Sequence, residues 1–107
     1  ARFENFAAIS LLKHVFGKTD YTGEKHELKY LRVKEGKEID FALVKNDQIE
    51  ELLEAKVSAG ELDKNLRYFS EKYGLKGTQL VKELKREKSV GKIDVVLAEK
   101  YFEELFL

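Results

Sequence analysis

The stretch EIDFALVKNDQIEELLEAK, residues 38–56, predicts a β-hairpin, because two apolar segments flank a polar turn at residues 46–48. Its charged residues are unusual for strands. Asp40 lies in the first segment, and Glu54 and Lys56 lie in the second, where strands favour β-branched and aromatic residues. Whether these side chains meet depends on the register of the hairpin.

The length of the loop sets that register. With a three-residue loop, Lys45 pairs with Ile49 and Asp40 lies opposite Glu54, whereas a two-residue loop would pair Asp40 with Leu53. A one-residue shift turns every side chain to the other face. The two alternating apolar sets fall on one face only with an odd-length loop; they are Ile39, Phe41 and Leu43, and Leu53, Ala55 and Val57. We therefore predict the three-residue loop, with Asp40 beside Glu54.

Two carboxylates in that position leave two interpretations open. Like charges directly opposite one another destabilise a strand pair by about 0.2–1 kcal/mol, so a positive charge is expected nearby. Lys56 can supply it, since it lies two residues beyond Glu54 on the same face. A bound divalent cation is the alternative. Because 37% of the residues are charged, the first interpretation, a surface cluster of the two carboxylates and a lysine, needs no ligand.

The composition bounds the class of protein. A chain of 107 residues is expected to form a single domain, residues 1–107. The absence of cysteine excludes disulfides and thiolate metal sites and suits the cytoplasm, where we expect the protein. No apolar run is long enough for a membrane span, so no membrane partner is expected. Methionine is absent, even at position 1, and we expect the chain to be a segment of a longer polypeptide.

The charge balance is zero overall but uneven along the chain. Residues 61–92 carry nine basic and five acidic side chains, a difference of +4. Zero net charge disfavours a protein that depends on non-specific nucleic-acid binding. The basic segment is consistent either with a solvated face or with a surface that contacts phosphate.

Periodicity predicts the elements in the order αβββαββα. Apolar residues recur at helical spacing from Phe3 to Phe16, and Gly17 is expected to end that helix before a loop at 20–25. Strands are predicted at 27–33, 39–44, 51–57, 78–84 and 92–98, and helices at 58–74 and 99–106. Because a helix connects the third strand to the fourth, the fourth is expected to be parallel to a neighbour. The predicted class is α/β with a mixed sheet.

These residues carry a resemblance to a known family. Glu4 in the first helix, Asp40 in the second strand and the triplet EAK at 54–56 resemble the PD-(D/E)XK nuclease superfamily. The segments RFENFAA, YLRVKEGKEIDFALVK and LLEAKVS resemble the DUF4143-type C-terminal domain of prokaryotic AAA+ family ATPases. The resemblance extends from Phe3 to about Leu97. It implies a restriction-endonuclease-like αβββαβ core, a mixed sheet flanked by helices, with an added strand and a C-terminal helix.

The sequence also departs from the family pattern. Ile39 stands where the motif of the superfamily has proline. The glutamine-to-tyrosine signature of some related nucleases has no match, because Asn65 and Tyr68 are only three residues apart.

The resemblance implies a site for Mg²⁺, with Mn²⁺ as a substitute. Asp40 and Glu54 would be ligands, Glu4 an outer or second-metal ligand, and Lys56 would orient the attacking water and offset transition-state charge. The implied reaction is hydrolysis of phosphodiester bonds in DNA, with an ATPase domain in the same parent chain as a partner. Two structural alternatives are also consistent with the sequence: Glu4 interacts with the dipole of its helix, and Lys56 pairs with Glu54. A catalytically inactive docking module for nucleic acid or protein is the alternative function.

Overall fold

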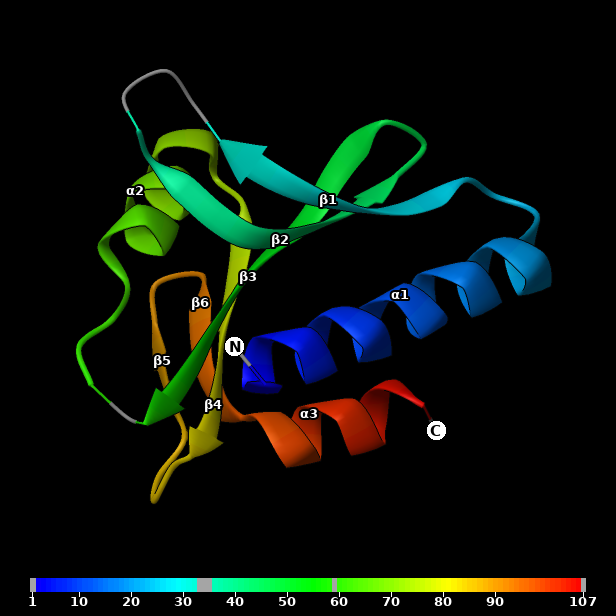
Figure 1. Ribbon diagram of the computed structural model, residues 1–107. Coiled ribbons are helices and arrows are strands. Elements are labelled where there is room, and N and C mark those ends of the chain that lie inside the picture. Colours follow the sequence, from blue (N-terminus) through cyan, green and yellow to red (C-terminus); the bar gives the residue numbers. More distant parts are fainter. Residues whose placement is uncertain (1, 33–35, 59, 107) are drawn as a thin grey trace.

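The structure, a computed structural model, describes residues 2–32, 36–58 and 60–106. Within these ranges the chain forms, in order, α1 (Arg2–Thr22), β1 (His26–Arg32), β2 (Glu38–Lys45), β3 (Gln48–Ser58), α2 (Lys64–Tyr73), β4 (Lys76–Glu83), β5 (Lys88–Val90), β6 (Ile93–Leu97) and α3 (Ala98–Leu105) (Figure 1). The order confirms the predicted α/β class and contains the expected αβββαβ series. Val33, the last residue of the first predicted strand, lies outside the described residues.

The described strands form one mixed six-stranded sheet in the order β1-β2-β3-β4-β6-β5. β1, β2 and β3 are antiparallel neighbours, whereas β3, β4 and β6 run parallel to one another. The expectation that the strand after the second helix is parallel to a neighbour is therefore confirmed. β5 was not expected, because its three exposed residues show no apolar alternation; it pairs antiparallel with β6 at the edge.

Helices cover both faces of the sheet. α2 lies on one face, and α1 and α3 lie together on the other (Figure 1). Each face has its own apolar cluster. The α2-side cluster contains Ile39, Ala42, Val44, Leu52, Leu66, Phe69 and Ile93, and the α1-side cluster contains Ala7, Leu11, Leu53, Leu80, Ala98 and Phe102. The described core is thus divided into two layers by β2, β3 and β4.

The first helix is longer than predicted. It passes through Gly17 and ends at Thr22, where the N–H of Gly23 donates to the carbonyl of Thr19 at 2.9 Å. Gly23 has a φ of 74°, the left-handed conformation that ends many helices. Gly17 is exposed, and a glycine inside an exposed helix costs only about 1 kcal/mol relative to alanine. The helix therefore continues, and part of the predicted loop at 20–25 is helical.

The second helix begins later than predicted. Asp63 is its N-terminal cap, and the predicted stop at Gly74 is confirmed by a left-handed φ of 64°. None of the helices that the structure describes combines the length and the apolar character needed to cross a membrane.

Candidate functional site

The hairpin has the predicted register at Asp40, but its turn is shorter than predicted and is followed by a β-bulge. Lys45 pairs with Gln48, so the loop has two residues, Asn46 and Asp47, and both have a positive φ, of 49° and 65°. The three-residue loop was wrong. Positive φ at both positions is the geometry of a type I′ turn, whose twist matches that of paired strands.

A β-bulge then restores the pairing that the apolar pattern requires. Val44 pairs with Ile49, but Leu43 pairs with Glu51, so Glu50 is an extra residue on β3. Beyond the bulge, Phe41 pairs with Leu53, and this register places Asp40 next to Glu54. The prediction that the two carboxylates are neighbours is confirmed.

A second bulge lies at Asp40 itself. β1 advances two residues from Lys29 to Leu31, while β2 advances three between their partners, Ala42 and Ile39. The extra residue reverses the alternation of β2, so Ile39 joins the α2-side cluster instead of facing the same way as Phe41. The prediction that Ile39 shares a face with Phe41 was wrong for this reason. Bulges re-aim side chains and are frequent beside active sites.

Beyond the pair Phe41–Leu53, hydrogen bonds to the carboxylates of Asp40 and Glu54 replace the backbone-to-backbone hydrogen bonds between β2 and β3. The N–H of Asp40 donates to Oε1 of Glu54 at 2.7 Å, and the N–H of Ala55 donates to Oδ2 of Asp40 at 3.1 Å. Each carboxylate therefore satisfies a backbone donor of the other strand. We call Asp40 and Glu54 the carboxylate pair.

The electrostatics of the pair are dominated by burial. Glu54 is only 7% exposed, and this burial raises its pKa to about 8. The N–H of Asp40 opposes the shift, the carboxylates of Asp40 and Asp63 add to it, and the charge of Lys56 reduces it. Near neutral pH the Glu54 carboxyl therefore largely retains its proton, and a cation bound there would displace it.

Lys56 pairs with Asp63, not with Glu54. Its Nζ lies 3.1 Å from Oδ1 of Asp63, and the hydrogen bond to Asp63 is the largest cause of a raised Lys56 pKa. The charges of Glu54 and Asp40 raise the pKa further, so both carboxylates act on the ammonium electrostatically. The interpretation of Lys56 as a simple partner of Glu54 is thus corrected.

Two site residues were missed in the sequence. Oδ2 of Asp63 accepts from the N–H of Leu66 at 3.0 Å, and the Asp63 N–H donates to Oε1 of Gln79 at 2.9 Å. Gln79 is 1% exposed and pairs with Glu54 across β3 and β4. Asp63 could have been found as a helix cap, and Gln79 as a polar residue inside a buried apolar strand.

Glu4 is not brought to the carboxylate pair. It is exposed in the first turn of α1, which covers the face opposite α2. Within residues 2–32, 36–58 and 60–106, no hydrogen bond or ion pair joins Glu4 to Asp40, Glu54 or Lys56. No three His, Asp or Glu side chains of these ranges converge into a metal-binding group. The predicted trio of Asp40, Glu54 and Glu4 is therefore not assembled.

The two remaining carboxylates suit a hard divalent cation. Among the described residues, Oδ1 of Asp40 and Oε2 of Glu54 have no hydrogen-bond or ion-pair partner. Neither oxygen is among the fully buried side-chain polar atoms without a partner there, which are His26 Nε2 and Glu27 Oε1, so each keeps some contact with solvent. Mg²⁺ is commonly held by one or two carboxylates while waters complete its coordination. The pair therefore fits the ion that the resemblance implies.

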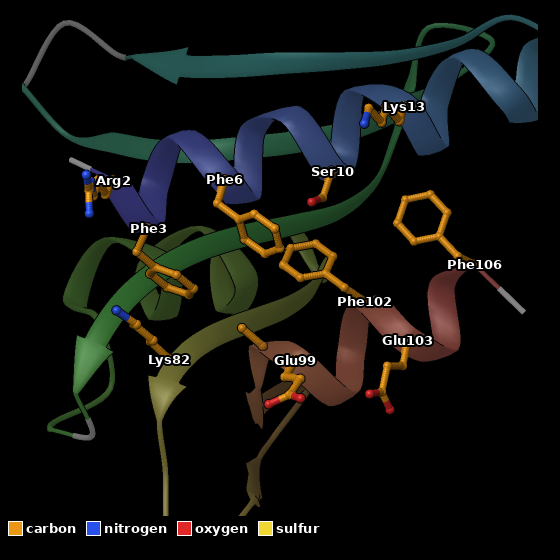
Figure 2. A pocket seen from close by; sticks show the side chains of 11 residues that line it. Arg2, Phe3, Phe6, Ser10, Lys13, Lys82, Glu99, Phe102, Glu103 and Phe106 are labelled. Atoms are coloured by element: carbon orange, nitrogen blue, oxygen red, sulfur yellow. The ribbon is translucent and has the colours of Figure 1, made fainter.

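A cavity among the described residues belongs to a different surface. It has a volume of about 900 Å³ and lies between α1 and α3, where Figure 2 shows Phe6 and Phe102 pointing toward one another. Their rings meet edge to face at 5.6 Å. Neither member of the carboxylate pair lines this groove, and neither does Lys56.

Comparisons of the chain with protein-family models, with curated proteins and with solved structures found no match.

Proposed function

We propose that this chain is a PD-(D/E)XK-type domain, related to DUF4143-type domains, that hydrolyses phosphodiester bonds of DNA with Mg²⁺ or Mn²⁺. The carboxylate pair is the observation that carries the proposal. It presents two carboxylate oxygens, Oδ1 of Asp40 and Oε2 of Glu54, that have no hydrogen-bond partner among the described residues, at the point where β2 leaves β3. Lys56 lies one alternation further along the same strand.

The side chains divide the work. Asp40 and Glu54 would hold Mg²⁺, which supplies charge neutralisation at the phosphate and a lowered pKa for a bound water. Lys56 has three donor hydrogens and uses one of them on Asp63, so two remain to orient the water and to offset developing negative charge. Asp63 is a positioning residue, since it fixes the Lys56 ammonium while it caps α2.

The cellular setting is proposed on the same basis. The resemblance supports DNA as the substrate and an ATPase domain of the same parent chain as a partner. The lack of cysteine supports the cytoplasm as the location.

The test is cleavage of labelled single-stranded, double-stranded and branched DNA with Mg²⁺ or Mn²⁺. Lys56→Ala should lower turnover by about 10²- to 10³-fold, the scale of one lost charge-stabilising donor, while metal binding persists. Glu54→Gln should weaken both turnover and metal binding. Lys29→Ala and Glu50→Gln, at exposed positions in β1 and β3, are the matched controls. Full activity in Lys56→Ala would assign the cleavage to a contaminant or to another site.

A docking module without turnover is the second candidate. The ion pair between Lys56 and Asp63 favours it, because a lysine held by a capping carboxylate also makes sense as a purely structural link. Binding of DNA without cleavage by the wild-type protein in either metal would support this candidate against the nuclease.

A further inference from the structure

The apolar residues of α1 form two stripes, and the sheet covers only one. Ala7, Leu11 and Val15 are buried against the sheet. Phe6 and Ile9 are each 56% exposed, and Phe16 is 62% exposed. Large apolar side chains in such a row are uncommon on a free surface and mark interaction sites. α1 therefore has a second apolar face that stays more than half exposed in the described chain, although Phe6 touches Phe102 at its edge.

The exposed face has a regular spacing. Its residues follow at intervals of four, three, four, three and four, the spacing of a coiled-coil seam. We call them the α1 seam: Arg2, Phe6, Ile9, Lys13, Phe16 and Asp20. A helix needs no such pattern on a face that meets only water.

The ends of the seam carry opposite charges. Arg2 lies in the first turn of α1 and Asp20 in the last, each at the end where the helix dipole disfavours its charge. In the ranges that the structure describes, neither residue belongs to an ion pair. Two such charges at opposite ends of one apolar stripe form a pattern that an antiparallel partner helix would neutralise.

A second copy of the chain supplies both partners at once. Two helices that cross antiparallel about residue 11 bring together positions whose numbers sum to 22. This places Arg2 against the partner's Asp20, Phe6 against the partner's Phe16, and Ile9 against the partner's Lys13. Each charge then also lies beside the favourable dipole end of the other helix. A parallel arrangement would oppose like charges at Arg2, Lys13 and Asp20, so the pattern selects the antiparallel one.

The neighbouring groove suits the same occupant. Phe102 of α3 packs edge to face on Phe6, so the seam borders the groove of about 900 Å³ between α1 and α3 (Figure 2). Its rim has basic Arg2, Lys13 and Lys82 and acidic Glu99 and Glu103. A surface that carries both signs around an apolar centre can be complementary to itself, as a two-fold interface requires. We infer that the chain forms an antiparallel homodimer through the α1 seam. This inference does not rest on the proposed nuclease activity.

The test is a charge swap followed by sedimentation velocity across a concentration series. Asp20→Arg places an arginine against the partner's Arg2, and Arg2→Asp places two aspartates together; each should weaken the dimer by about tenfold or more, since the interface is used twice. The double variant Arg2→Asp/Asp20→Arg restores opposite charges and should recover most of the affinity. Lys18→Asp, an exposed charge of α1 outside the seam, is the control for altered net charge.

An apolar pair completes the experiment. Phe16→Ser should shift the protein toward monomer, whereas Tyr21→Ser, which removes an exposed aromatic outside the seam, should not. Thermal melts of each variant confirm that it is folded. A wild-type monomer at every concentration would overturn the inference. So would a dimer that ignores Phe16→Ser, or single charge variants that the double variant fails to rescue.

Discussion

The ammonium of Lys56 lies 3.1 Å from Oδ1 of Asp63, while the second oxygen of the same carboxylate caps α2. One side chain thus fixes both the start of a helix and the orientation of the proposed catalytic lysine. The two functions of Asp63 differ in energy, because a cap satisfies backbone donors whereas a partly exposed ion pair is screened by water.

Removal of Asp63 should therefore destabilise the protein more than removal of Lys56. Asp63→Ala loses the cap and should lower the free energy of unfolding by about 1–2 kcal/mol. Lys56→Ala loses an ion pair whose lysine is 40% exposed and should cost less than about 1 kcal/mol. Urea titrations of both variants measure the difference. A larger loss in Lys56→Ala would show that the ammonium also stabilises the carboxylate pair in the native state.

The titration of Glu54 should make stability depend on pH. Burial raises its pKa from 4.5 to about 8, so between these values the folded chain keeps a proton that the unfolded chain releases. The free energy of unfolding should then fall as pH rises through that window, by at most about 1.4 kcal/mol per pH unit, and level off above the folded pKa. Glu54→Gln cannot titrate but can still accept from the N–H of Asp40. The stability of Glu54→Gln relative to the wild type should therefore increase between pH 5 and pH 8, by at most about 1.4 kcal/mol per pH unit, and stay constant from there to pH 9. Thermal melts at each pH measure this difference. A difference that does not change with pH would contradict the assignment.

Binding of Mg²⁺ should compete with the same proton. As the pH is lowered below 8, the dissociation constant for Mg²⁺ should rise by up to about tenfold per pH unit. Binding should release about one proton at neutral pH. Calorimetry in two buffers of different ionisation enthalpy counts the released protons. Glu50→Gln should behave as the wild type does, whereas Glu54→Gln should show weak binding without proton release. Affinity that is independent of pH would place the ion elsewhere.

Gln79 should be required for the geometry around Asp63. Gln79→Leu fills the same space but leaves the N–H of Asp63 without its acceptor, which should cost about 1–3 kcal/mol. Gln48→Leu changes the same residue type at an exposed position of β3 and serves as the control. Urea unfolding compares the two. Equal effects would mean that the buried amide contributes no specific hydrogen bond to the stability of α2.

Much of the arrangement follows from apolar alternation, but not its local irregularities. The pairing of Asp40 with Glu54 was predictable, since a single register buries both Phe41 and Leu53. The bulge at Glu50 that permits this register with a two-residue turn was not, because a bulge is favoured by the sum of distant packing contacts. The same holds for Ile39, whose face depends on a mismatch with β1.

Other differences arise where two signals compete. Gly17 and Gly23 both resemble helix stops, and tertiary contacts decide between them: the Thr19 hydroxyl, in the last turn, accepts from the N–H of His26 at 3.1 Å. The second helix was predicted to start at residue 58, whereas in the structure it starts after Asp63, whose N–H donates to Oε1 of Gln79. The ends of these helices depend on contacts with residues outside the helices, so the local sequence pattern alone could not predict them.

The bulge at Glu50 separates the tip of the hairpin from the carboxylate pair. The extra residue shifts the pairing of β2 and β3 by one residue between the turn and Asp40. The register at Asp40 is therefore no longer set by the two residues of the turn. Loops of other lengths could therefore replace Asn46 and Asp47 while the pair keeps its spacing, provided that the bulge is retained. The hairpin tip is thus a position where new recognition loops can be grafted onto this scaffold without redesign of its chemistry.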